Sequence, residues 1–337
     1  MLKKVAIYGA GSIGGWIGVA LARAGCDVSV VARGATLAAI QRDGLRLHRN
    51  GKLEAAPVTA SDDPAKLGVQ DLVVIAVKAP ALAQIASAVA PLLGAQTAVL
   101  TAMNGVPWWY FLSPGFGGAL AGRRLESIDP DGRIARGIPV EHVLGCVVHA
   151  SCSLDSPGVV RHHFGNQLIV GEPSGGVSAR ATELAALLEQ AGIEVKVSDR
   201  IQRDIWFKLW GNMTVNPISA FTGATTDRIM GDPLVRAFAS SVMLEAKAIG
   251  ARIGIDIPQQ PEDRHAITAK LGAFKTSMLQ DVEAQRPVEL DALVTVVHEL
   301  GQLTAVATPF TDALLGLARL HACGIGLYSQ ASDASAV

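Results

Sequence analysis

Three polar side chains recur at every fourth position in segment 204–217. They are Lys208, Asn212 and Asn216, which would form one polar stripe on a helix. Apolar residues surround the stripe: Trp206, Phe207, Leu209, Trp210 and Met213. An ammonium and two amides in such surroundings favour a cleft that holds a polar ligand, although amides that only satisfy neighbouring loops would give the same pattern. Pro217 should kink or end the helix here, because it removes a backbone donor.

Three glycines follow a short apolar run near the start of the chain. The run Val5–Tyr8 precedes Gly9, Gly11 and Gly14, and segment 16–24 is compatible with a helix, so we predict a strand, a tight turn and a helix. In such a turn the first glycine permits the bend, the second lets the backbone approach a pyrophosphate, and the third lets the helix pack on the strand. Dinucleotide phosphates would then meet the helix N-terminus, although a purely structural turn has the same spacing. The expected cofactor-binding residues are Gly9, Ala10, Gly11, Ser12, Ile13 and Gly14.

Arg33 follows the second predicted strand, residues 27–31. An acidic residue about 20 positions after the glycines binds the ribose 2′-hydroxyl of NAD, whereas an arginine there accommodates the 2′-phosphate of NADP. No acidic residue stands at that place, so the sequence favours NADP(H) over NAD(H). An ordinary solvated arginine is the alternative.

Lys78 and Asn104 come directly after two further predicted strands, residues 71–77 and 98–102. Ligands of open α/β sheets bind outside the carboxyl ends of the strands. Both side chains are therefore expected near the glycine turn. A surface lysine and a simple Asn-Gly turn are the structural alternatives.

The remaining pattern predicts an α/β fold: an N-terminal Rossmann dinucleotide-binding domain, residues 1–198, and an all-helical C-terminal substrate and catalytic domain, residues 199–337, with the active site between them. In the first domain we expect a hairpin or an edge excursion of the sheet at 45–58 and helices at 81–93 and 179–191. We also expect strands at 143–150 and 193–197, and two strands within 159–170 around Gly165-Asn166. From Asp199 the β pattern stops and helical patterning continues to Ala322.

Two stretches are less regular. Segment 106–139 is interpreted as a long surface excursion with one aromatic patch, which would be either a lid over a substrate or a docking point for the second domain. The tail 329–337 is small and polar and is expected to be disordered.

Composition excludes several classes of protein. The formal charge is -1 and only 5% of residues are aromatic, so a nucleic-acid-binding protein is not expected. The four cysteines show no CxxC spacing, which favours a reducing compartment. Arg23 and interrupting glycines argue against an export leader, and no apolar run elsewhere reaches a membrane-spanning length, so we expect a soluble cytoplasmic protein. No metal site is expected, since His162 and His163 would point to opposite faces of a strand.

Several separate motifs in this order resemble the ketopantoate reductases, also called 2-dehydropantoate 2-reductases. The resemblance extends from the first strand to about Pro309. It is carried by the glycine turn, Lys78, Ala102-Met103-Asn104-Gly105, the Lys208 to Pro217 segment, Lys275-Thr276-Ser277-Met278-Leu279-Gln280-Asp281 and Glu289. It implies NADPH-dependent reduction of 2-dehydropantoate to (R)-pantoate in pantothenate biosynthesis, with a homodimer left open.

The resemblance also implies roles for single residues. Lys208 would donate a proton to the ketone oxygen. Asn104, Asn212, Asn216 and Ser277 would hold the substrate. Cofactor contacts are implied for Arg33, Lys78 and Asn104, in addition to the glycine turn. Glu289 would be a second catalytic residue that orients cofactor and substrate groups.

These roles agree with the chemistry of the residue types. Hydride transfer to a 2-oxo acid develops negative charge on the ketone oxygen, and the Lys208 ammonium can stabilise that charge and then donate a proton. An ionised Glu289 would keep this lysine protonated. Pro287 can begin a helix, which would place Glu289 in a first turn.

The chain also departs from the family pattern. Residues 225–227 are Thr-Thr-Asp where a further asparagine is expected, and segment 106–139 is longer than usual. Another 2-oxo acid or related ketone is therefore an alternative substrate. A non-catalytic NADP(H)-sensing protein is an alternative of a different class, although it would not need a proton donor.

Overall fold

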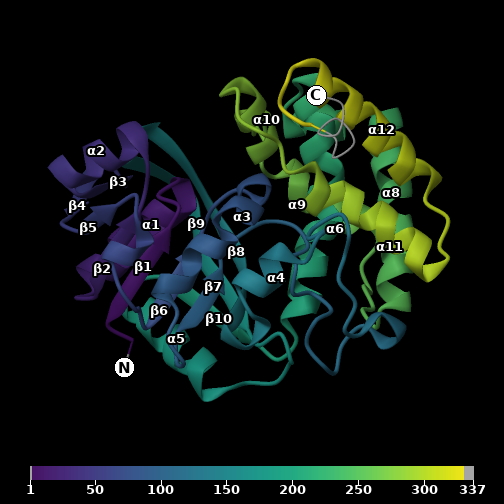
Figure 1. Cartoon of the computed structure of the whole chain (residues 1–337). Helices are drawn as coiled ribbons and strands as arrows, with labels where there is room; N and C mark the ends of the chain where they lie inside the picture. Colours follow the sequence, from purple (N-terminus) through teal and green to yellow (C-terminus); the bar gives the residue numbers. More distant parts are fainter. Residues whose placement is uncertain (1, 330–337) are drawn as a thin grey trace, which may run out of the picture. The chain divides into compact units, whose positions relative to one another are not determined.

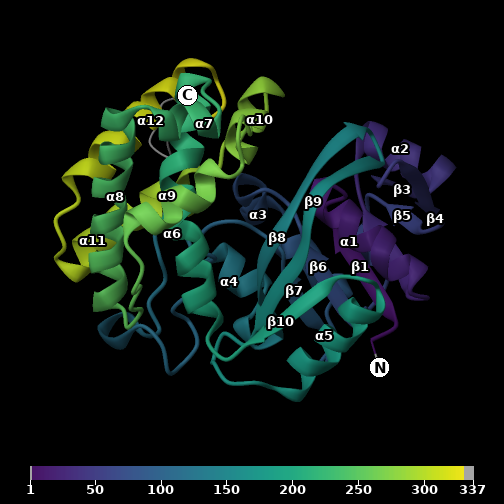
Figure 2. The same cartoon turned by 180° about the vertical axis from the view of Figure 1, so that it is seen from behind.

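The computed structural model describes residues 2–329 (Figures 1 and 2). The chain forms two compact units. The first contains Met1–Asn104, Trp108–Gly115 and Asp131–Asp204, and the second contains Gly105–Pro107, Phe116–Pro130 and Ile205–Val337. The predicted tail lies almost entirely outside the described residues.

The first unit is a Rossmann domain built on a 10-stranded mixed sheet. The strand order is β4-β3-β9-β8-β7-β6-β1-β2-β5, with β10 paired to β9. The strands are β1 (Lys4–Tyr8), β2 (Asp27–Val31), β3 (Leu45–Arg49), β4 (Lys52–Ala56), β5 (Thr59–Ser61), β6 (Leu72–Ile75), β7 (Ala98–Thr101), β8 (Val143–Ser156), β9 (Val159–Gly171) and β10 (Glu194–Ser198). The segment from β8 to β5 is parallel throughout, whereas β8–β9 and β3–β4 are antiparallel.

The α-helices of this unit are α1 (Ser12–Arg23), α2 (Gly34–Asp43), α3 (Ala79–Ile85), α4 (Arg133–Gly137) and α5 (Ala179–Gln190). The unit also contains the 3₁₀ helices η1 (Pro64–Lys66), η2 (Ala86–Leu92) and η4 (Val140–His142). The helix predicted at 81–93 is therefore α-helical only in its first part, and Pro91, which lacks a backbone donor, lies inside η2.

The predicted hairpin and the predicted second strand are confirmed by β3–β4 and β2. The two strands expected within 159–170 are wrong, because β9 is continuous. Gly165 (φ +76°) lies at an irregularity in the pairing with β8, and a Cβ there would come 2.5 Å from the His149 carbonyl oxygen. The Gly-Asn pair therefore marks a bulge instead of a turn.

The aromatic patch is not a surface feature. Trp108, Trp109, Tyr110 and Phe111 are at most 1% exposed. Trp109 Nε1 donates to Thr101 Oγ1 at 3.3 Å. Trp108 Nε1 donates to the Ile138 carbonyl, and the Tyr110 hydroxyl donates to the Gln202 carbonyl. The interpretation of these residues as part of a surface excursion is wrong, since they form interior packing of the Rossmann domain.

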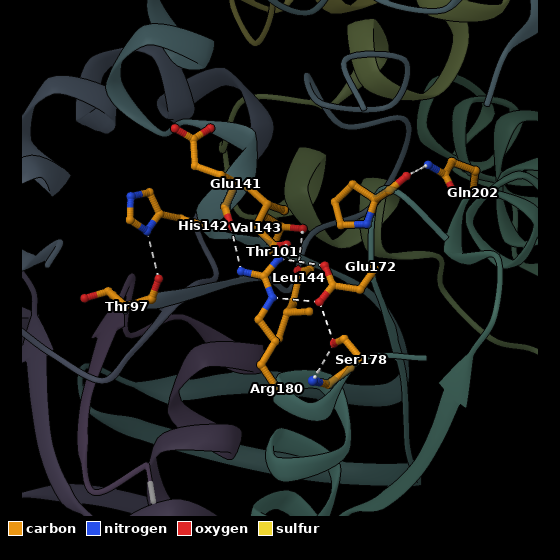
Figure 3. A network of polar contacts seen from close by, with 12 residues as sticks. Thr97, Thr101, Glu141, His142, Val143, Leu144, Glu172, Ser178, Arg180 and Gln202 are labelled. Atoms are coloured by element: carbon orange, nitrogen blue, oxygen red, sulfur yellow. Dashed lines mark hydrogen bonds and ion pairs between the residues drawn. The ribbon is translucent and has the colours of Figure 1, made fainter. Parts of the chain in front are cut away.

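A partly buried ion pair joins the residue after β9 to α5 (Figure 3). Arg180 donates to the two carboxylate oxygens of Glu172 at 2.7 and 2.6 Å, and Ser178 donates to the same carboxylate at 2.6 Å. Arg180 also donates to the carbonyls of Glu141 and Val143, next to the start of β8. Burial raises the pKa of the Glu172 carboxyl, but the bonds from Arg180 and Ser178 and the arginine charge outweigh it, so the net pKa is lowered.

The second unit is helical. Its elements are η3 (Gly118–Leu120), α6 (Ile201–Thr222, which begins in the first unit), α7 (Thr226–Gly231), α8 (Pro233–Arg252), α9 (Pro261–Ala269), α10 (Ser277–Glu283), the π-helix η5 (Asp291–Thr295), α11 (Val296–Thr304) and α12 (Pro309–Gly324). No strand occurs between residues 205 and 329, as predicted. Of the two effects expected of Pro217, a kink or an end of the helix, the end is wrong, because α6 continues to Thr222.

One carboxylate ties an early segment of the chain to this helical unit. Glu299 on α11 accepts bonds from the backbone N–H groups of Glu126 and Ser127 at 2.8 and 2.9 Å and from the Ser127 hydroxyl at 2.5 Å. Segment 116–130 is therefore an integral part of the second unit.

Candidate active site

The glycine turn has the geometry that its spacing predicts. Gly9 has φ +101°, a conformation that side chains disfavour. A Cβ on Gly14 would lie 2.1 Å from the Gly9 carbonyl oxygen, so α1 packs directly on the turn. A Cβ on Gly11 would meet nothing within 4 Å. Protein atoms thus fill the space beside Gly14, whereas the space beside Gly11 is unoccupied by protein atoms.

Candidate cofactor residues follow three neighbouring parallel strands. Gly11, Arg33 and Lys78 are the N-cap residues of α1, α2 and α3, which come after β1, β2 and β6. None of these helices has an acidic residue in its first turn or a side-chain cap at its start. Since β1 lies between β2 and β6, right-handed crossovers place α1 and α3 on opposite faces of the sheet. This is the switch point where open α/β sheets bind their ligands.

Arg33 lies close to the end of β1. Burial raises the pKa of the Tyr8 phenol, while the charge of Arg33 and its hydrogen bond to that phenol act in the opposite direction. Arg33 itself is exposed. Its guanidinium is therefore held beside the glycine turn and remains accessible to an anion.

Lys78 and Asn104 are both half-buried. The strands that precede them, β6 and β7, are paired in parallel, with Ile75 opposite Thr101. The structure therefore brings both residues to the sheet edge that carries the glycine turn.

The polar stripe of the second unit lies on a firmly anchored helix. Trp206, Trp210 and Met213 on α6 are fully buried, and Trp210 Nε1 donates to the Met243 carbonyl at 2.7 Å. Lys208 and Asn212 are half-buried, and Asn216 is 7% exposed. The apolar positions thus fix the helix while the stripe becomes more buried along its length.

Ser277 and Glu289 belong to the same unit but to other elements. Ser277 is the first residue of α10, whose N-cap Thr276 accepts a bond from the Leu279 N–H at 3.2 Å. Glu289 is 5% exposed and precedes the helical stretch that begins at Leu290. Its expected place inside a first turn begun by Pro287 is therefore wrong.

The π-helix η5 was not expected from the sequence, and π-helical turns are frequent at functional sites. It starts two residues after Glu289. The Asp291 carboxylate accepts bonds from Tyr328 and Thr295 at 2.6 and 3.0 Å. Burial is the main cause that raises the pKa of Tyr328 above its usual value. The hydrogen bond to Asp291 and the charge of Asp291 raise it further. This polar group fixes the backbone that follows the candidate glutamate.

The residues that replace the expected asparagine are largely engaged within the fold. Thr226 is 1% exposed, and its hydroxyl donates to the Gly272 carbonyl at 2.7 Å. Asp227 is exposed and accepts a bond from the Thr225 hydroxyl. The Thr226 hydroxyl thus joins α7 to the loop before α10.

Residues 2–329 contain no group of three or more His, Cys, Asp or Glu side chains that could hold a metal ion. Within the same residues, no helix is both long enough and apolar enough to span a bilayer.

Comparison with known proteins identifies the family. Residues 5–175 match the family model for "Ketopantoate reductase PanE/ApbA", and residues 200–322 match the model for its C-terminal part. The chain belongs to the ketopantoate reductase family. It is an oxidoreductase by this membership.

Relatives of the ketopantoate reductase family match over nearly the whole chain. A 2-dehydropantoate 2-reductase from Mesorhizobium japonicum is 48% identical over 97% of this chain and 100% of its own length. A crystal structure from Ralstonia solanacearum MolK2 is 56% identical, with a TM-score of 0.94 over 97% of this chain and 100% of that chain.

A more distant structure shares the fold. D-mandelate dehydrogenase, solved with NADH and anilino(oxo)acetate, has a TM-score of 0.82 at 22% identity and covers 96% of this chain and 100% of that chain.

Proposed function

We propose that the protein catalyses the NADPH-dependent reduction of 2-dehydropantoate to (R)-pantoate, a step of pantothenate biosynthesis. The observation that carries this proposal is the polar stripe of Lys208, Asn212 and Asn216 on the anchored helix α6. The 48% identity to a 2-dehydropantoate 2-reductase over the full length of that relative supports the substrate.

The residues of the first unit fit a dinucleotide. The open approach at Gly11 and the uncapped N-terminus of α1 suit a pyrophosphate, because unpaired backbone N–H groups and the helix dipole favour anions there. Arg33 would pair with the 2′-phosphate of NADP, and Lys78 and Asn104 would add contacts from the neighbouring strands. When bound, the nicotinamide supplies a hydride to the ketone carbon.

Lys208 provides the acid in the proposed mechanism. As the ketone becomes an alcohol, its oxygen gains negative charge, which a nearby ammonium stabilises before it transfers a proton. Asn212, Asn216 and Ser277 would hold the substrate, because their amides and hydroxyl can donate to its oxygens. The Glu289 carboxylate would favour the protonated lysine and orient substrate and cofactor groups.

A substrate panel tests the proposal. Purified protein is mixed with NADPH or NADH and a set of 2-oxo acids, and cofactor oxidation is followed. We expect the highest kcat/KM for 2-dehydropantoate with NADPH. A clear preference for another ketone, or for NADH, would contradict the corresponding part of the proposal.

Reduction of a different 2-oxo acid is the second candidate. It is favoured by the replacement of the expected asparagine by Thr225-Thr226-Asp227 and by the engagement of the Thr226 hydroxyl within the fold. The shared fold of a D-mandelate dehydrogenase bound to an oxo acid analogue is compatible with it. The same panel distinguishes the two candidates.

A non-catalytic NADP(H) sensor is the third candidate. Tight NADPH binding without reduction of any ketone would support it. The presence of both Lys208 and Glu289 argues for the enzyme, since binding alone requires no proton donor.

A further inference from the structure

Arg264 on α9 is half-buried, and the structure supplies no anionic partner for its guanidinium. Its Nε is inaccessible to solvent and has no hydrogen-bond acceptor. No carboxylate among residues 2–329 forms an ion pair with this side chain, and burial is the only influence on its pKa, which is lowered from the usual arginine value. Arginine has so high an intrinsic pKa that it stays charged at neutral pH, so a partly buried positive charge is left unneutralised.

Even a partly buried charge loses solvation, and the inaccessible Nε of Arg264 has no acceptor to compensate for that loss. Most buried charges in proteins are paired with an opposite charge or bind one supplied by a ligand. Arg264 contacts the Phe207 ring face, with Cζ 5.7 Å from its centroid. An aromatic face orients a guanidinium but does not neutralise it. The missing partner is accordingly an anion that arrives from outside the chain.

The position of the guanidinium points to the substrate. It lies against Gly211 of α6, where a Cβ would come within 2.4 Å of Arg264 Nε and 2.9 Å of Nη2. Glycine inside a helix is unfavourable, so its presence in α6 is explained by the room that it leaves for Arg264. Phe207 and Gly211 directly precede Lys208 and Asn212 in the sequence. The guanidinium therefore lies beside the polar stripe, on the neighbouring face of α6 that carries Phe207 and Gly211.

We propose that Arg264 binds the carboxylate of the 2-oxo acid substrate and so selects acids over neutral ketones. In a 2-oxo acid the carboxylate is bonded to the ketone carbon, so a cation for the carboxylate must lie next to the proton donor for the ketone oxygen. The planar guanidinium suits a carboxylate because it can donate two parallel bonds. This assignment rests on the proposed reduction of a 2-oxo acid, and it adds a residue that the motifs did not reveal.

Steady-state kinetics of Arg264→Met test the assignment. We expect KM for the 2-oxo acid to rise by roughly 10- to 100-fold, the range for a hydrogen bond to a charged group, with a smaller change in kcat. Affinity for NADPH should be unchanged. Arg264→Lys should recover part of the loss, and Arg252→Met, which alters an exposed arginine of the same unit, should behave as wild type.

Two further measurements separate substrate binding from a structural role. For a neutral analogue of the substrate, such as its lactone, Arg264→Met and wild type should have the same KM. Gly211→Ala should displace the guanidinium and raise KM for the acid only. An unchanged KM for the acid in Arg264→Met, or equal losses for acid and neutral ketone, would overturn the assignment.

Ligand-induced thermal shifts distinguish this proposal from the proposed function. If wild type reduces no 2-oxo acid, the proposed function fails, and small 2-oxo and 2-hydroxy acids are added to the NADPH complex. A rise in Tm for wild type that is lost in Arg264→Met supports a carboxylate site. An equal rise in both proteins, or none in wild type, overturns it.

Discussion

Two glycines of the same turn should respond to alanine in opposite ways. At Gly14 the new Cβ would lie 2.1 Å from the Gly9 carbonyl oxygen, and backbone cannot rotate away as a flexible side chain does. Overpacking usually destabilises by about 1–3 kcal/mol, and so short a contact belongs at the upper end. Alanine regains about 1 kcal/mol of helix propensity. The net loss is then about 2 kcal/mol, or a Tm lower by roughly 4–8 °C for a domain of this size.

Gly11→Ala is the matched change. Its Cβ meets nothing within 4 Å, and its φ of -76° is open to alanine, so Tm without ligand should stay close to wild type. The methyl group would instead occupy the space through which a pyrophosphate approaches, and NADPH affinity should fall.

Thermal unfolding without ligand and calorimetric titration with NADPH measure both effects. A stable Gly14→Ala protein would show that α1 does not press on the turn as described. Undiminished NADPH affinity in Gly11→Ala would remove the turn from the cofactor site.

Three other substitutions test separate parts of the molecule. Lys208→Ala should lower kcat by roughly 10²–10⁴-fold with little change in NADPH affinity, and a nearly full kcat would exclude it as the acid. Arg33→Asp should weaken NADPH much more than NADH in parallel titrations, since it removes a charge-assisted contact, whereas equal losses would indicate a structural role. Because the pKa of Glu172 is lowered in the fold, its ion pair with Arg180 stabilises above the unfolded pKa and is lost as pH falls through the folded one. Urea unfolding at several pH values should therefore show a smaller acid-induced loss for Glu172→Gln, and an unaltered slope would refute this.

Local patterns predicted much of the first unit. The glycine spacing and the apolar runs around it predicted β1, α1 and β2, because a positive φ at Gly9 and close packing at Gly14 restrict those two positions to glycine. The placement of Lys78 and Asn104 at one sheet edge follows from parallel pairing alone.

The errors arise where distant parts of the chain decide the structure. Gly165-Asn166 has the composition of a turn, and only the pairing with β8 turns it into a bulge. Trp108 and its aromatic neighbours stand among prolines, glycines and charges, so their burial cannot be read locally. Nothing in the sequence marked Arg264 as a site residue except Gly211, a glycine within a helical pattern. That glycine is explained only by the packing of Arg264 of α9 against α6.

The bonds that Ser127 donates to the Glu299 carboxylate span 172 positions of the chain. The helical unit is consequently not a contiguous module, since it includes segments 105–107 and 116–130. A fragment that starts at Ile205 would lack segment 116–130. The Glu299 carboxylate would then lose all three of its donors. During synthesis, segment 116–130 must wait until α11 has left the ribosome before it reaches its partner. Closing so long a loop carries an entropic cost. Folding of residues 131–204 into the Rossmann domain would reduce this cost, because it shortens the free chain between Ser127 and Glu299.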